Sequence, residues 1–240
     1  MNDKSFSWSI IEENDDLISN IKKKNISKHV PDQRLLCKNC CWLIASITTI
    51  RDNLIIQDYF TDITFRVLYN KPNEKTIDNS FKYLSTLGPF MTTDNRIFIL
   101  KNVRPITNLS CSFKTQIEIK NQIRNKGPVV GCLPLFQNFI NGNFARENKI
   151  YFENKTDKII GFHTTEIVGW GNEGDVNYWV CKNSWGIHWG QNGFFKIAMF
   201  PHNNITQFEK LTQVIYENTK YTVGFAVAFD IHEMILPNTF

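Results

Sequence analysis

The chain has 240 residues, of which 42% are hydrophobic, so it can bury the core of one large domain or of two small ones. Its formal net charge of +4 is small, and apart from Lys22–Lys24 its basic residues are scattered, which gives no support for nucleic-acid or membrane binding. No apolar run approaches the roughly 20 residues of a spanning helix and no apolar signal segment precedes the rest, so we expect a soluble intracellular protein.

Three helices are predicted in the first half of the chain. Apolar residues recur at helical spacing after Cys41, which predicts a buried helix starting near that residue. A second helix is predicted over 77–87, where Gly88-Pro89 would end it, and a third over 114–124, before Gly127-Pro128.

The second half of the chain is predicted to be rich in strands. Runs of β-branched and aromatic residues bounded by Gly, Asn and Asp indicate strands at 129–133, 159–168, 177–182, 193–200 and 222–230. Helices followed by strands are typical of an α+β fold.

The six cysteines are predicted to be reduced. Three of them crowd one segment and three lie singly in apolar contexts: Cys37, Cys40, Cys41, Cys111, Cys132 and Cys181. A buried free thiol behaves as a small apolar group, so a reducing compartment is expected. Cys37 and Cys40 also have the C-x-x-C spacing of a redox or zinc site, but no second Cys or His pair follows at ligand spacing.

A thiol, an imidazole and a side-chain amide occur in that order at wide spacing. They are Cys41 before Trp42, His163 in a glycine-flanked strand, and Asn183 at the start of an Asn-Ser-Trp-Gly block. Thiol-based acyl transfer needs a nucleophile, a general base and a group that orients the base. Glu166 follows His163 by three residues, and period-two alternation places it on the opposite face of the strand.

These segments resemble the papain/cathepsin family of cysteine peptidases, with cathepsin B-like and virus-encoded members as the nearest types. The similar stretches lie within about 30–52 and 117–200. The resemblance implies a two-lobed papain-like α+β fold with an active-site cleft between the lobes. Residues 1–113 would form a helical left lobe, and residues 114–240 a β-barrel-like right lobe with a C-terminal extension.

The resemblance also assigns roles to individual residues. Cys41 would be the nucleophile, His163 the base and Asn183 the orienting amide. A helix N-terminus and a nearby imidazolium would favour a Cys41 thiolate. We prefer Cys41 to Cys40 because Cys41 directly precedes Trp42, as in the family's Cys-Trp pair. Adjacent helical residues point about 100° apart, so only one of the two thiols can face the imidazole.

Gln33 is the candidate oxyanion donor, together with the backbone N–H of Cys41. It lies eight positions before Cys41, two more than in the family. Either Leu35-Leu36 bulges out and leaves the donor in place, or the oxyanion site is malformed. The implied substrate-binding residues are Trp185, Gly161 and Thr164, and Trp185 would also cover the hydrogen bond between His163 and Asn183.

The chain departs from the family in three respects. It lacks the family's Cys-Asn-Gly-Gly segment, the His-His loop of cathepsin B and a propeptide. The missing His-His loop predicts endopeptidase action on polypeptides, and no metal or cofactor is expected. A catalytically silent papain-fold binding protein is the alternative, and a thiol transferase or deubiquitinase-like hydrolase would share the same chemistry. An intracellular or virion-associated location is expected.

Overall fold

The computed structural model describes residues 5–8, 26, 29–36, 40–57, 90–91, 97–105, 113–152, 158–199, 212–216, 219–223 and 226–234. Its helices are α1 (Gln33–Leu36), α2 (Cys41–Ile56), α4 (Phe113–Lys126), α5 (Gln137–Asn141) and α6 (Asn143–Arg146). Its strands are β1 (Phe6–Ser7), β2 (Phe90–Met91), β3 (Ile97–Pro105), β4 (Val129–Phe136), β5 (Ile150–Tyr151), β6 (Ile159–Glu173), β7 (Val176–Lys182), β8 (Phe194–Ala198), β9 (Thr212–Tyr216), β10 (Thr219–Val223) and β11 (Ala226–Met234). The α+β class is therefore confirmed.

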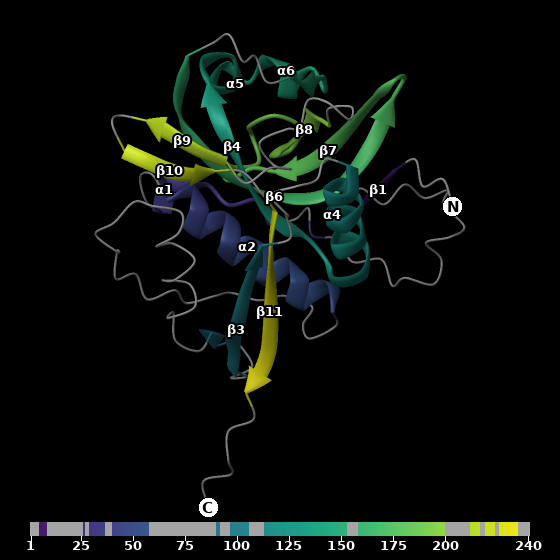
Figure 1. Ribbon diagram of the computed structural model, residues 1–240, viewed down its shortest axis with the longest axis vertical. Coiled ribbons are helices and arrows are strands. Elements are labelled where there is room, and N and C mark those ends of the chain that lie inside the picture. Colours follow the sequence, from purple (N-terminus) through teal and green to yellow (C-terminus); the bar gives the residue numbers. More distant parts are fainter. Residues whose placement is uncertain are drawn as a thin grey trace, which may run out of the picture.

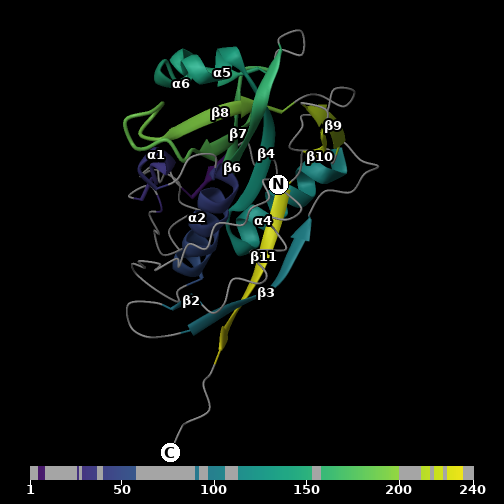
Figure 2. The ribbon, with the colours of Figure 1, turned by 90° about the vertical axis from the view of Figure 1, so that its left-hand side faces the viewer.

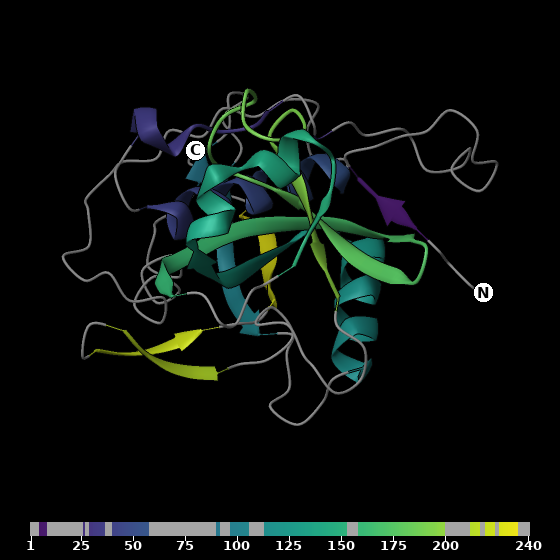
Figure 3. The same cartoon turned by 90° about the horizontal axis from the view of Figure 1, so that it is seen from above.

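One sheet joins most of the described strands. Its order is β2-β3-β11-β4-β6-β7-β8-β5, and β1 pairs with β6 beyond the end of β4. The neighbouring strands run antiparallel, except that β5 and β8 are parallel. The β9–β10 hairpin forms a separate sheet and stands apart from the rest in Figure 3.

The two longest helices pack against the long strand β6. Figures 1 and 2 show α2 crossing the sheet next to β6, while α4 stands beside the same strand. The buried side of α2 contributes Ile50 and Leu54, and α4 contributes Ile119 and Ile123, all with no exposed surface. This packing brings the first residue of α2 to the middle of the sheet.

Strands β6 and β7 carry the polar residues of interest. His163 lies in β6 opposite Leu133 of β4, and β7 ends at Lys182, one residue before Asn183. Because β6 and β7 are hydrogen-bonded neighbours, residues 20 positions apart in the chain come together.

Most of the predicted elements are confirmed. Helix α2 begins at Cys41 and α4 contains the predicted helix over 114–124. Strands β4, β6, β7 and β8 occupy the four predicted positions between 129 and 200, although β6 continues to Glu173. The helix predicted over 77–87 lies outside the described residues. The strand predicted over 222–230 is divided between β10 and β11.

The prediction did not include β1 or β3. Strand β3 lies before residue 113 and pairs with β11 near the other end of the sequence. The division of the chain into lobes at residue 113 stays a prediction. Strand β1 has two residues, and its pairing depends on distant contacts that no local pattern reveals.

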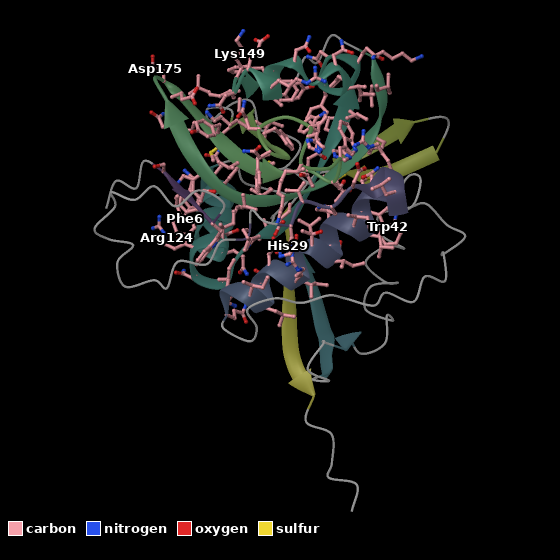
Figure 4. The ribbon with its side chains drawn as sticks, turned by 180° about the vertical axis from the view of Figure 1, so that it is seen from behind. Phe6, His29, Trp42, Arg124, Lys149 and Asp175 are labelled. Atoms are coloured by element: carbon pink, nitrogen blue, oxygen red, sulfur yellow. The ribbon has the colours of Figure 1, made fainter. Side chains whose placement is uncertain are left out.

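The β1 segment is held to the sheet by aromatic contacts. Its backbone passes so close to Gly169 that a side chain there would meet the Phe6 carbonyl oxygen at 2.2 Å. Phe6 stacks on Trp170 with ring centroids 5.2 Å apart, and the indole N–H of Trp8 donates to the Ile123 carbonyl at 2.8 Å. The guanidinium of Arg124 lies over the Phe6 ring, and Figure 4 shows the two side by side.

The cysteine prediction is partly wrong. Cys132 and Cys181 are buried free thiols, as expected, but Cys40 is disulfide-bonded. The expectation of fully reduced cysteines therefore fails at Cys40, because crowding in the sequence does not reveal which thiols meet in space. No helix in the described part of the chain is long and apolar enough to cross a membrane.

Candidate active site

The Cys41 thiol lies at the first residue of α2. It is free and half-buried, whereas the preceding Cys40 is 6% exposed and disulfide-bonded. The disulfide removes Cys40 as a competing nucleophile. Between these two neighbours, only Cys41 has a thiol that can react.

The surroundings of Cys41 raise the pKa of its thiol. Burial is the largest cause, and hydrogen bonds from the backbone of Thr164 and of Trp42, and from the Thr164 side chain, oppose it. Burial of the thiol thus acts against the expected stabilisation of a thiolate by the helix N-terminus. The contact with Thr164 places the sulfur beside the residue that follows His163.

The Asn183 side-chain oxygen determines the tautomer of His163. The backbone N–H of Ser184 donates a hydrogen bond to the Asn183 side chain at 2.8 Å. Only the oxygen of an amide group can accept such a bond, so the atom at this position is Oδ1. The same Oδ1 lies 2.7 Å from Nε2 of His163, so Nε2 carries a hydrogen and donates it. The other ring nitrogen, Nδ1, is then unprotonated in the neutral ring and can accept a proton.

The imidazole of His163 is enclosed by aromatic rings. Its side chain is 2% exposed, and the ring centroid of Trp185 lies 4.7 Å away. Burial lowers the pKa of His163 to about 4, although the hydrogen bond with Asn183 acts in the opposite direction. His163 is therefore a neutral base at neutral pH.

Trp185 belongs to a larger aromatic cluster that packs around the His163 ring. Its ring meets Trp189 edge-on at 5.3 Å and Phe139 edge-on at 5.8 Å. Phe139 has no exposed surface and also lies 6.0 Å from the His163 ring. These contacts leave the imidazole little freedom to tilt away from Asn183.

Gln33 is positioned by backbone pairing with the segment after Asn183. The Gln33 N–H donates to the Ser184 carbonyl at 2.8 Å, and the Gly186 N–H donates to the Pro31 carbonyl at 2.9 Å. Between them, Asp32 and Trp185 form an isolated antiparallel bridge. The longer spacing between Gln33 and Cys41 therefore does not remove Gln33 from the neighbourhood of Asn183.

The described part of the Gln33–Cys41 connection begins with a helical turn. Helix α1 spans Gln33–Leu36, and the Leu35 side chain is 84% exposed. Arg34 joins the turn to the site through a double hydrogen bond with the Asp32 carboxylate and a further one to the Trp185 carbonyl. The Leu35 side chain points outward, while the role of Gln33 as oxyanion donor stays a prediction.

Gly161 and Thr164 occupy different environments. A side chain at Gly161 would meet no atom within 4 Å, so the backbone there borders open space. Thr164 is 4% exposed and lies against the Cys41 thiol. Gly161 thus has room for a ligand beside it, whereas Thr164 contributes to the wall behind the thiol.

A buried group of charges lies beside this site. The Lys182 ammonium contacts the Asp52 carboxylate of α2 and donates to the Ile26 carbonyl at 2.8 Å, while Glu166 lies 3.6 Å from it. Burial, followed by the negative charge of Asp52, raises the pKa of Glu166 well above its usual value. Glu166 therefore belongs to this charge group, in agreement with its predicted position on the strand face away from His163.

Sequence reasoning missed two features of the site. One is the charge group, for which the sequence around Asp52 and Lys182 carries no clear local signal. The other is Ser184. Its backbone N–H bonds to Asn183, while its carbonyl and its hydroxyl bond to Gln33. Its position directly after Asn183 carries no local signal of that role.

Known proteins resemble this chain in sequence and fold. The family model described as Papain family cysteine protease matches residues 76–215. The protein named probable cysteine proteinase 224L of Invertebrate iridescent virus 6 is 27% identical over 88% of the chain. Cathepsin B-like cysteine proteinase 3 of Caenorhabditis elegans is 36% identical over 35% of it. The chain spans 65% and 21% of the lengths of these two relatives.

A solved structure of procathepsin B from Trypanosoma congolense has a similar fold. The TM-score is 0.60 at 15% sequence identity, over 86% of this chain and 74% of that chain. The papain-like fold and the likeness to cathepsin B-like and viral proteinases are thus confirmed, while Gln33 and Cys41 lie before the residues that the family model matches.

Proposed function

Since this chain belongs to the papain family of cysteine proteases, we propose that it hydrolyses internal peptide bonds of polypeptides through an acyl-enzyme formed at Cys41. The observation that carries this proposal is the 2.7 Å contact between His163 Nε2 and Asn183 Oδ1, because it leaves Nδ1 unprotonated beside the segment that touches the thiol.

The first step is attack on the scissile carbonyl. His163 takes the thiol proton at Nδ1, and the Cys41 sulfur forms a bond to the carbonyl carbon. Because the thiol and the imidazole are both uncharged at rest, the proton moves as the substrate binds and the sulfur attacks. The carbonyl oxygen gains negative charge and needs donors at that moment.

Two donors are available for that oxygen. The amide Nε2 of Gln33 is one, and the backbone N–H of Cys41 is the other, since the first N–H groups of a helix have no partner within the helix. The oxyanion then collapses, the C–N bond breaks, and His163 gives its proton to the leaving amine. Water, deprotonated by the same imidazole, releases the acid product and restores the thiol.

Labelling the thiol tests this proposal. Iodoacetamide is expected to add one carbamidomethyl group at Cys41 and to stop cleavage of a peptide library, as read by peptide mapping and mass spectrometry. Cys41→Ala should lower the cleavage rate on the order of a thousandfold or more.

Cys132→Ala is the matched control, because Cys132 is a free thiol that is 1% exposed in β4. This variant is expected to keep both labelling and cleavage. A folded wild-type chain that cleaves no peptide and takes no label would instead support the silent binding protein.

A further inference from the structure

The Cys41 sulfur lies among hydrogen-bond donors from two elements that are far apart in the sequence. The backbone of Trp42, in the first turn of α2, forms a hydrogen bond with this thiol. Thr164, in β6, forms hydrogen bonds with it through both its backbone and its hydroxyl. Since Thr164 is only 4% exposed, solvent competes little for that hydroxyl. Its polar group therefore contacts the reacting atom of the proposed nucleophile.

The packing of α2 on β6 explains why Thr164 reaches the thiol. Period-two alternation places Thr164 and Glu166 on the same face of β6. Cys41 and Asp52 lie about three turns apart, which places them on the same side of α2. Glu166 interacts with Asp52 across this contact between helix and strand, and Figure 1 shows α2 crossing next to β6. Two packed elements thus position the hydroxyl against the sulfur.

A hydroxyl can serve the sulfur in both of its protonation states. It can accept a hydrogen bond from a thiol or donate one to a thiolate, because its O–H rotates, whereas a backbone N–H can only donate. A hydrogen bond to an ionised acceptor is roughly twice as strong as one between neutral groups. The Thr164 hydroxyl therefore favours the charged sulfur over the neutral one.

The buried site needs such a donor when the thiol loses its proton. Burial raises the pKa of the Cys41 thiol and lowers the pKa of His163 to about 4, so the resting site holds no imidazolium to stabilise a thiolate. The negative charge that develops on the sulfur must be stabilised by dipoles that are already in place.

We propose that the Thr164 hydroxyl is a catalytic hydrogen-bond donor, which stabilises the negative charge on the Cys41 sulfur as His163 removes the thiol proton. The inference rests on the proposed function and deepens it, since it concerns the nucleophile of that reaction. The thiol proton goes to Nδ1 of His163, and the hydroxyl keeps its own hydrogen throughout.

Alkylation of Cys41 by iodoacetamide tests the donor directly, because the reagent reacts with the thiolate. Thr164→Val removes the hydroxyl and keeps a β-branched side chain of similar shape. It is expected to lower the alkylation rate at neutral pH roughly three- to tenfold, the range that corresponds to one hydrogen bond, and to move the inflection of the rate–pH profile upward. Thr164→Ser keeps the hydroxyl and should restore both. Peptide mapping separates the label at Cys41 from any label at Cys132, the buried free thiol opposite Thr164 in β4.

Thr48→Val is the matched control. Thr48 is 8% exposed, and its hydroxyl donates to the Ile44 carbonyl at 2.7 Å within α2, the helix that begins at Cys41. This variant should keep the alkylation rate within twofold of wild type. Thr164→Ala provides a second, smaller variant without the hydroxyl and should show the same loss as Thr164→Val.

The inference is overturned if Thr164→Val and Thr164→Ala alkylate as fast as wild type, if Thr48→Val slows equally, or if Thr164→Ser fails to restore the rate. A raised KM with an unchanged alkylation profile would show that Thr164 serves substrate binding alone. Because alkylation needs no peptide cleavage, a wild type that takes the label but cleaves no peptide overturns the proposed function, while the alkylation rates still decide the role of the hydroxyl.

Discussion

At the scale of single residues, the Asn183 oxygen decides which nitrogen of His163 can take a proton. It accepts hydrogen bonds from the Ser184 N–H and from His163 Nε2, so Nδ1 is left as the base. Burial sets the strength of that base, because removing water penalises the imidazolium more than the neutral ring.

The pH dependence of kcat/KM should report this base. With the pKa of His163 lowered to about 4, its neutral form is fully present above that pH and is lost as the pH falls through it. The acid limb of kcat/KM is therefore expected near pH 4, measured with an uncharged peptide substrate. A limb near the ordinary histidine value of 6.5 would contradict this prediction.

Asn183→Ala provides a directional check on the same measurement. Its hydrogen bond raises the pKa of His163, so its loss should move the acid limb to lower pH, together with a lower kcat.

At the scale of elements, buried charges join α2 to the strands that carry His163 and Asn183. Asp52 of α2 and Lys182 of β7 contact each other with no exposed side-chain surface, next to Glu166 of β6. Removing one member of such a pair leaves a charge without solvent or partner, which is more costly than removing both. The pair thus ties the helix that begins at Cys41 to the strand that leads into Asn183.

Lys182→Met is expected to lower the free energy of unfolding by about 3–5 kcal/mol, because the Asp52 carboxylate loses its ammonium partner. The measurement is urea unfolding followed by tryptophan fluorescence. Adding Asp52→Leu to Lys182→Met should recover much of the loss, since no unpaired charge then remains at either position.

The exposed ion pair between Lys149 and Glu147 supplies the control, with side-chain exposures of 70% and 55%. Lys149→Met should change the free energy of unfolding by less than about 1 kcal/mol. Equal losses of unfolding free energy for Lys182→Met and Lys149→Met would contradict the prediction. They would show that burial does not determine how much the Lys182–Asp52 pair contributes to stability.

At the scale of the whole molecule, the site depends on the docking of residues 29–36 against the segment after β7. Gly193 shows how close this approach is. Its φ is +89°, its carbonyl accepts the Asn183 N–H at 2.8 Å, and a side chain there would lie 2.4 Å from Val30. Val30 lies three residues before Gln33, so Gly193 lies against the segment that positions Gln33.

Gly193→Ala is expected to reduce both stability and kcat. A left-handed φ and the clash with Val30 together should cost about 2–5 kcal/mol of unfolding free energy. Displacement of the Gln33 segment should also lower kcat, as measured by steady-state cleavage of a peptide.

Gly174→Ala separates the two causes. Gly174 has a φ of +57° in the turn between β6 and β7, and a side chain there meets nothing within 4 Å. It should lose about 1–2 kcal/mol from backbone strain alone and keep its kcat. A comparable loss of kcat in Gly174→Ala would contradict the role assigned to the contact with Val30.

Local patterns predicted the helix that starts at Cys41, the helix before Gly127 and the four strands between 129 and 200. They succeeded because apolar periodicity and turn residues reflect interactions between residues close together in the chain. They could not predict β1, whose two residues pair only because Gly169 admits the backbone of Phe6.

By itself, the sequence determined which groups are present and in what order: Cys41, His163 and Asn183, each inside a motif short enough to be recognised along the chain. The tertiary structure alone decided that Cys40 is disulfide-bonded and that Gln33 bonds to Ser184 across 151 positions of sequence. It also decided the burial that raises the pKa of Cys41 and lowers the pKa of His163. The physical reason is that a motif depends on neighbours in the chain, whereas solvent exclusion and long-range hydrogen bonds depend on distant residues that meet only after folding.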